Sequence, residues 1–245
     1  MEIMKEIEID KRRRVIPVQE GIEAAHVTLG HFLMVAKEVL PKRPLTIALS
    51  GGSTPKGFYQ TLTESQEASQ IDWKQVSFFW SDERACPPDH QESNFRMCME
   101  FFKKEPFCQA KFFRMPADAQ DLETAALGYE TLILNHAFEG RFDIVYLGMG
   151  DDGHTASLFP HTKALDEKKQ LVVANYIEAK KSWRMTLTFQ CINQARNIVV
   201  LVLGASKKEP LKYVFQPHSR LPIWRVGTSS TPALYITDVY ESTGN

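Results

Sequence analysis

The segment Gly148–Pro160 carries the residues best suited to chemistry, because three glycines surround Asp152 and His154 directly after an apolar run. An unprotonated imidazole, whose ordinary pKa is roughly 6.5, can accept a proton from water near neutrality. A carboxylate two residues away fixes its tautomer and raises its basicity if the loop folds back. We therefore predict that His154 is a general base with Asp152 as its partner. The simpler alternative is a polar histidine whose hydrogen bonds are merely satisfied.

The same two side chains could also ligate a metal ion. A structural or catalytic zinc site takes three or four protein ligands, and no further ligand stands at a suggestive spacing from Asp152 and His154. The cysteines fall in no CxxC pair, and they are Cys86, Cys98, Cys108 and Cys191. We predict no metal site and reduced thiols.

The segment Ser50–Pro55 lies between an apolar run and a helical pattern. Its glycines let the backbone approach an anion, its hydroxyls donate hydrogen bonds, and the helix that follows offers unpaired N–H groups. The predicted phosphate ligands are Gly51, Gly52, Ser53 and Thr54. The pattern is neither a Walker motif nor GxGxxG, so a nucleotide is not indicated. A tight turn with Thr54 as N-cap and Pro55 as first helical residue is supported equally well.

Charged residues follow other apolar runs. Asp82 and Arg84 come directly after Val76–Trp80, where they would face the mouth of a cleft. An arginine held by acidic neighbours could bind an anion or stabilise a developing oxyanion, although an isolated Asp-Glu-Arg is more often a surface turn. Arg184 and Lys207 stand at the ends of two later runs and could complete an anion site.

These residues need elements that bring them together. Five apolar runs rich in β-branched and aromatic residues predict buried strands, namely 45–49, 76–80, 142–147, 198–203 and 233–236. Apolar residues at spacings of three and four predict two helices between them. Their stripes are Ala25, Leu29, Phe32, Ala36 and Val39, and Leu122, Ala125, Tyr129, Leu132 and His136.

Strands that alternate with helices predict an α/β, Rossmann-like fold, with a mostly parallel sheet, helices on both faces and the site at the strand ends. The alternation in 184–189 predicts an antiparallel strand at a mixed edge of this sheet. No linker or repeat divides the chain, so we predict a single domain over residues 1–245.

Composition limits the partners. Lys plus Arg number 29 and Asp plus Glu number 30, so the net charge is −1, which provides no field that would attract nucleic acid or an acidic membrane. The basic run Lys11–Arg14 is expected to be a solvated face. Met1–Glu6 is too charged for a signal peptide, and no apolar run approaches the roughly 18 residues of a membrane span. We expect a cytoplasmic protein without nucleic-acid or membrane partners, either a monomer or a weak homo-oligomer.

Six motifs in order resemble the 6-phosphogluconolactonase family over residues 21–238. They are SGGSTP at 50–55, SDER at 81–84, SNF at 93–95, GMGDDGHTASLFP at 148–160, SWRMTLT at 182–188 and the turn at 204–207. The resemblance implies a Rossmann-like fold shared with glucosamine-6-phosphate deaminases, action on 6-phosphoglucono-1,5-lactone in the pentose phosphate pathway, and no cofactor.

The resemblance also implies roles for the residues already singled out. His154 resembles the family's general base, Asp152 the neighbouring carboxylate, and Arg84 a residue that positions or polarises the lactone. The first loop, with Arg184 and Lys207, would hold the 6-phosphate, and Asp82 would contact the substrate.

Two other functions compete with lactone hydrolysis. The deaminase pattern GHIAFNEP places a glutamate five residues after its histidine, where this chain has Phe159, and it favours DEY where this chain has Asp82-Glu83-Arg84. Isomerisation moves a proton between carbons and needs a second acid/base group, so the residues present favour hydrolysis. A non-catalytic sugar-phosphate sensor would keep the phosphate loop without turning over the lactone.

Overall fold

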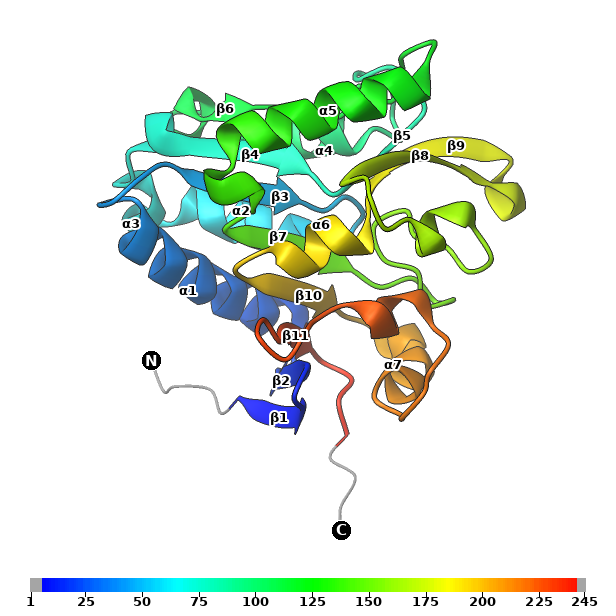
Figure 1. Cartoon of the computed structure of the whole chain (residues 1–245). Coiled ribbons are helices and arrows are strands. Elements are labelled where there is room, and N and C mark those ends of the chain that lie inside the picture. Colours follow the sequence, from blue (N-terminus) through cyan, green and yellow to red (C-terminus); the bar gives the residue numbers. More distant parts are fainter. Residues whose placement is uncertain (1–5, 242–245) are drawn as a thin grey trace.

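The computed structural model describes residues 6–241 (Figure 1). Residues 1–5, which carry most of the charged opening on which the signal-peptide expectation rests, lie outside this range. The extent of the predicted single domain, 1–245, also reaches beyond it and stays a prediction. No helix within the described residues is long and apolar enough to cross a membrane.

The main sheet has eight strands in the order β1-β2-β11-β10-β7-β3-β4-β6. All its neighbouring pairs are parallel except β1 with β2. The five predicted strands are confirmed as β3 (Leu45–Leu49), β4 (Val76–Trp80), β7 (Ile144–Gly148), β10 (Ile198–Val202) and β11 (Ala233–Thr237). Three more were not predicted: β1 (Ile7–Asp10), β2 (Arg13–Pro17) and β6 (Lys111–Phe112).

Helices cover both faces of this sheet, as predicted, because successive side chains of each buried strand point to opposite sides. On β4, Phe78 stacks on Phe102 of α4 (Asn94–Phe102), at 4.9 Å between ring centroids. Its neighbour Phe79 meets Tyr129 of α5 (Leu122–His136) on the other face, at 5.7 Å.

The remaining helices are distributed over these two faces and the sheet's edges (Figure 1). Helix α1 (Gly21–Val39) packs on α2 (Lys56–Glu64), and α2 packs on α4. The others are α3 (Gln66–Ser69), α6 (Phe189–Gln194) and α7 (Lys208–Val214). Both predicted helical stripes lie on helices, although the buried positions of α5 are Ala126, Tyr129 and Ile133, with His136 exposed.

A second sheet of three antiparallel strands, β5-β9-β8, adjoins the ends of the main strands. It consists of β5 (Asp82–Arg84), β8 (Val172–Ile177) and β9 (Ser182–Leu187). The antiparallel strand predicted at 184–189 is therefore confirmed, but its placement at the edge of the main sheet is wrong, since the mixed edge is β1. The reason is Ser81, whose N–H donates to Leu49 of β3 while its carbonyl accepts from Leu187 of β9, both at 2.8 Å.

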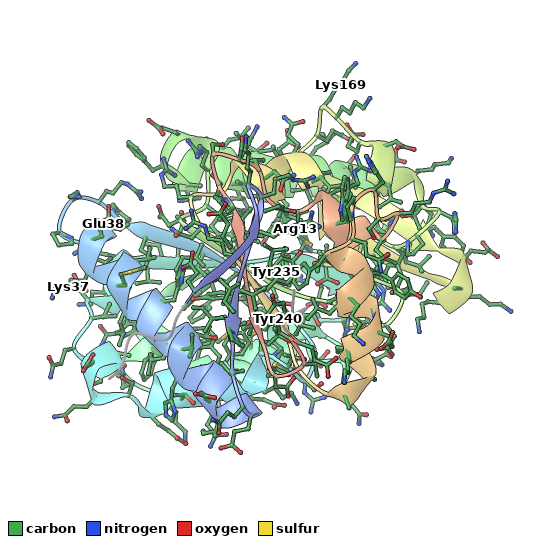
Figure 2. The ribbon with its side chains drawn as sticks, turned by 90° about the horizontal axis from the view of Figure 1, so that it is seen from below. Arg13, Lys37, Glu38, Lys169, Tyr235 and Tyr240 are labelled. Carbon is green, nitrogen blue, oxygen red and sulfur yellow. The ribbon has the colours of Figure 1, made fainter. Side chains whose placement is uncertain are left out.

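The basic run Lys11–Arg14 is not a solvated face throughout. Arg13 is only 4% exposed, lies on β2, pairs with Asp10 and donates to the carbonyl of Val214. Figure 2 shows Arg13 close to Tyr235 at the centre of the view, whereas Lys37 and Lys169 project from the periphery. The buried cation is tolerated because its donors have partners.

Candidate active site

The carboxyl ends of the main strands open into a cleft of about 390 Å³. The loops after β3, β7 and β10 form its walls together with one face of the second sheet. Every predicted site residue except Asp152 lines this cleft, namely Gly51, Gly52, Ser53, Thr54, Asp82, Arg84, His154, Arg184 and Lys207. The expectation that parallel strands deliver their functional residues to one edge of the sheet is therefore met.

His154 is held by Asp152 through two contacts. Its ring Nδ1 lies 2.5 Å from Oδ1 of Asp152, and its backbone N–H donates to the same oxygen at 3.1 Å. The tautomer that donates Nδ1–H to this carboxylate leaves Nε2 as the basic nitrogen. The His154 side chain is 29% exposed and reaches the cleft, while Asp152 lies behind it and does not line the cleft.

The carboxylate of Asp152 stays ionised in this arrangement. Partial burial raises the pKa of Asp152, but hydrogen bonds from the ring and backbone of His154 outweigh burial and leave the pKa below its ordinary value. An ionised Asp152 stabilises the imidazolium that forms when His154 takes a proton.

Gly150 leaves the room that this pair requires. A Cβ at Gly150 would lie 2.1 Å from Nδ1 of His154 and 2.8 Å from Oδ1 of Asp152. The loop closes on itself through the Gly150 N–H, which donates to the carbonyl of His154 at 2.9 Å. Glycine at this position is therefore needed for close approach.

The second sheet fixes the rest of the loop by binding every polar group of Ser157. The Ser157 N–H donates to Oγ1 of Thr186 at 3.1 Å, and its hydroxyl donates to Oδ2 of Asp82 at 2.6 Å. The Ser157 carbonyl accepts from Nδ2 of Asn175 at 2.9 Å. Because Asp82 and Thr186 are direct partners across the ladder, both point to the face that the loop covers.

The first loop shapes the opposite wall. Gly51 packs against Asn94, whose side-chain Oδ1 would lie 1.9 Å from a Cβ at that position, and Gly52 has a φ of 90° with open space beside it. Helix α2 begins at Lys56 with Pro55 as N-cap, and no side chain caps it. The alternative in which Thr54 is the N-cap and Pro55 the first helical residue is therefore wrong, and the hydroxyl of Thr54 is not used as a cap.

Arg84 and Arg184 are direct cross-strand partners on β5 and β9, so their side chains emerge side by side. Arg84 donates to the carbonyl of Glu92. Nε and Nη1 of Arg184 are buried and have no partner among the described residues. Burial, and then the charge of Arg84, lower the pKa of Arg184 below its ordinary value. Two adjacent guanidiniums with free donors are a costly arrangement that an anion would relieve.

Lys207 completes the cationic side of the cleft. Its Nζ lies 2.6 Å from Oδ1 of Asp151, which is 72% exposed. The hydrogen bond from Lys207 lowers the pKa of Asp151. Lys207 thus reaches the cleft, where its ammonium group could bind a substrate phosphate in addition to the exposed carboxylate of Asp151.

Four residues shape the site but were given no catalytic or binding role from the sequence. Asn94 lines the cleft and donates to the Asp82 carbonyl at 2.9 Å, and Ser157 and Phe159 line it from the loop. Glu83 is only 3% exposed, and its carboxylate accepts from the N–H groups of Asn94 and Phe95 at 2.8 Å each. The SDER, SNF and TASLFP motifs contained these residues, but only their partners in space reveal what they do.

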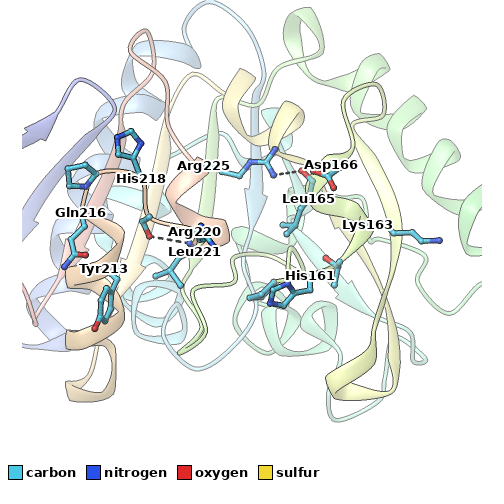
Figure 3. Close-up of a pocket in the computed structure, with 14 residues that line it drawn as sticks. His161, Lys163, Leu165, Asp166, Tyr213, Gln216, His218, Arg220, Leu221 and Arg225 are labelled. Atoms are coloured by element: carbon cyan, nitrogen blue, oxygen red, sulfur yellow. Dashed lines mark hydrogen bonds between the residues drawn. The ribbon is translucent and has the colours of Figure 1, made fainter.

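A larger cleft of about 920 Å³ lies beyond the end of the same loop, between Pro160–Asp166 and the segment 213–225 (Figure 3). Arg225 spans its two walls by donating to the carbonyl of Leu165 at 2.6 Å. The lining of this larger cleft contains none of the predicted site residues. Within residues 6–241, no group of three or more His, Cys, Asp or Glu side chains is arranged to hold a metal ion.

The chain is similar to known proteins in sequence and in structure. A family model described as glucosamine-6-phosphate isomerases/6-phosphogluconolactonase matches residues 20–235. A 6-phosphogluconolactonase of Chlamydia pneumoniae is 38% identical over 194 residues, which cover 78% of this chain and 74% of that protein. Its counterpart in Chlamydia trachomatis is 34% identical over 234 residues, or 94% and 90% of the two chains.

Among solved structures, the 6-phosphogluconolactonase from Trypanosoma cruzi superposes with a TM-score of 0.82 at 26% identity. That match covers 96% of this chain and 98% of the other. The predicted Rossmann-like α/β fold is therefore confirmed.

Proposed function

The chain belongs to the glucosamine-6-phosphate isomerase/6-phosphogluconolactonase family, and we propose that it hydrolyses 6-phospho-D-glucono-1,5-lactone to 6-phosphogluconate in the oxidative branch of the pentose phosphate pathway. The observation that carries this proposal is one cleft lined both by a histidine that a carboxylate holds from behind and by an arginine with unpaired donors among the described residues. The first can activate water, and the second can bind the phosphate of the substrate.

The cationic wall would anchor the 6-phosphate. Arg184 offers two buried donors without partners, Arg84 stands beside it, and Lys207 adds a third charge. The backbone of Gly51–Thr54 would supply further donors from the facing loop. Fixing the phosphate at one end of the cleft places the lactone carbonyl near His154, so that attack by water becomes effectively intramolecular.

His154 would act as general base and then as general acid. Its Nε2 takes a proton from water while the water oxygen bonds to C1 of the lactone, and the carbonyl electrons move onto oxygen. When the tetrahedral intermediate collapses, the bond between C1 and the ring oxygen breaks, and that oxygen takes the proton from Nε2. Asp152 holds the imidazolium between these two steps.

The oxyanion needs donors that are in place before reaction. Arg84 can serve it, as can N–H groups of the glycine-rich loop. The carboxylate of Asp82, which already accepts from Ser157 and Asn94, would contact a substrate hydroxyl. This chemistry requires no cofactor and no metal ion.

Hydrolysis fits the site better than isomerisation does. Phe159, which lines the cleft at the position where the deaminase pattern carries glutamate, offers no proton-transfer group. We further propose a cytoplasmic enzyme, either monomeric or a weak homo-oligomer, that binds neither nucleic acid nor membranes.

The direct test is turnover by the purified protein. Lactone and acid are followed by NMR, and 6-phosphogluconolactone should be consumed far faster than its spontaneous hydrolysis. Unphosphorylated glucono-1,5-lactone should lose at least about 100-fold in kcat/KM, because hydrogen bonds to charged groups are worth about 1.5–3 kcal/mol each. Release of ammonia from glucosamine 6-phosphate would instead identify a deaminase. Thermal stabilisation by 6-phosphogluconate without turnover would identify a sensor.

A further inference from the structure

The ring of Phe159 lies flat on the imidazole of His154, with 3.8 Å between centroids and 15° between planes. Phe159 is only 8% exposed, so the surrounding protein restricts the movement of its ring. Most aromatic pairs in the protein are tilted or stacked within the apolar core. This pair instead joins a core residue to the proposed base at the surface of the cleft.

The stack completes the enclosure of the imidazole. Asp152 fixes the ring edge at Nδ1, and Gly150 lies so close that a Cβ there would be 2.2 Å from Cε1. Phe159 covers one face of the ring. A tilt of the ring out of its plane would break the stack, and a half-turn would remove Nδ1 from Asp152, so Nε2 keeps a single direction.

The stack also favours the charged form of the base. The face of an aromatic ring carries negative potential and attracts a cation placed above it. His154 becomes such a cation when it accepts the proton of water. We propose that Phe159 is a positioning residue, which holds Nε2 of His154 toward the cleft and stabilises the imidazolium formed during the reaction. This inference rests on the proposed role of His154.

Other charges act on the same imidazole and must be kept constant in a test. Asp152 contacts the ring, and the cleft around it carries Asp82, Arg84, Arg184 and Lys207, with Asp151 beside Lys207. Substitution of Phe159 changes none of these groups. Leucine at this position would keep an apolar, buried contact, so the lost aromatic face is the main difference.

The experiment compares Phe159→Leu with Phe159→Tyr by two readouts. Both the kcat at the pH plateau and the pH dependence of kcat/KM are measured with the lactone. For Phe159→Leu the acidic limb of kcat/KM should move to lower pH by about half a unit, as expected for a cation–aromatic contact at a partly exposed site. The kcat at the pH plateau should fall about tenfold, because Nε2 loses its fixed direction. Phe159→Tyr should retain both values.

A matched control is Phe189→Leu, which truncates another buried ring that stacks on Arg225 at 4.4 Å and lies outside the cleft lining. It should leave the acidic limb of kcat/KM unchanged. If the wild type hydrolyses the lactone and the acidic limb of Phe159→Leu stays in place or moves to higher pH, the inference is overturned. Absence of lactone hydrolysis by the wild type would instead refute the proposed function.

Discussion

Replacing Asp152 with asparagine removes the charge that holds His154 while keeping the shape of the side chain. In the folded enzyme, Oδ1 of Asp152 accepts from both the ring and the backbone of His154. An asparagine amide would present either a weaker acceptor or an N–H donor to Nδ1. In the second case the proton would move to Nε2, and the nitrogen that must accept a proton from water would be blocked.

The size of the effect follows from the exposure of the carboxylate. A hydrogen bond to a charged group contributes about 1.5–3 kcal/mol. Because the Asp152 side chain is 48% exposed, water replaces part of this interaction, and we expect the lower end of the range. Asp152→Asn should therefore reduce kcat/KM about 10- to 30-fold, at 1.36 kcal/mol for each factor of ten.

The pH dependence gives a second, independent readout. The pKa of Asp152 lies below its ordinary value, so the carboxylate stays charged throughout the working range and favours the imidazolium form of His154. In Asp152→Asn, the acidic limb of kcat/KM should move to lower pH. The affinity for 6-phosphogluconate should change less than about twofold, because Asp152 does not line the cleft.

Asp151→Asn is the matched control, since it removes the same charge from the adjacent residue. Asp151 is 72% exposed and, among the described residues, pairs only with groups of the Gly204–Lys207 turn. An exposed pair of this kind contributes about 0–1 kcal/mol. Its kcat/KM should fall less than about fivefold. The reasoning would be refuted by a wild-type kcat/KM in Asp152→Asn, or by an equal loss in Asp151→Asn.

Three further substitutions test other parts of the account. Arg184→Met should raise KM about 10- to 100-fold, yet raise Tm by a few degrees, because it removes two buried donors that have no partner among the described residues. An unchanged KM would contradict its role. Gly150→Ala should lower kcat/KM at least as much as Asp152→Asn does, because the new Cβ displaces the His154 ring. Gly128→Ala, whose Cβ would meet nothing within 4 Å, should leave kcat/KM unchanged in a parallel assay. Burial lowers the pKa of His31 to about 4, so between pH 6.5 and 4 the unfolded chain binds one proton more than the folded chain. The free energy of unfolding should therefore decrease by up to about 1.4 kcal/mol for each unit by which the pH falls in this range. His31→Phe should flatten this pH dependence, as measured by urea unfolding.

The strands were predictable where burial alone decides them. β3 and β4 coincide with the predicted runs, because a strand covered on both faces is apolar throughout. β5 reads Asp-Glu-Arg, with Asp82 and Glu83 buried and Arg84 partly exposed, and no local pattern indicates a strand. This strand is stable because the carboxylate of Glu83 accepts hydrogen bonds from N–H groups at the start of α4, eleven and twelve residues further along the chain. Arg13 on β2 is a similar case, since its partners are set by the tertiary fold.

The lining of the cleft and the contact of Asp152 with His154 were predictable from the sequence, but the contacts of Arg184 and Phe159 were not. Glycines and charges at strand ends identified the lining of the cleft, because parallel strands deliver their carboxyl ends to one edge. That Arg84 faces Arg184 depends on the register of a second sheet, which pairs residues one hundred positions apart. That Phe159 stacks on His154 depends on how the loop folds back, which spacing does not determine.

The most direct test of the central claim is the rate of 6-phosphogluconolactone hydrolysis by His154→Ala. The general base is expected to contribute about 100- to 10,000-fold, so kcat should fall by that factor. Circular dichroism and Tm should match the wild type, because the side chain lies at the cleft surface, and 6-phosphogluconate should still bind. A folded His154→Ala enzyme with an undiminished kcat would contradict the assignment of His154 as the base that activates water.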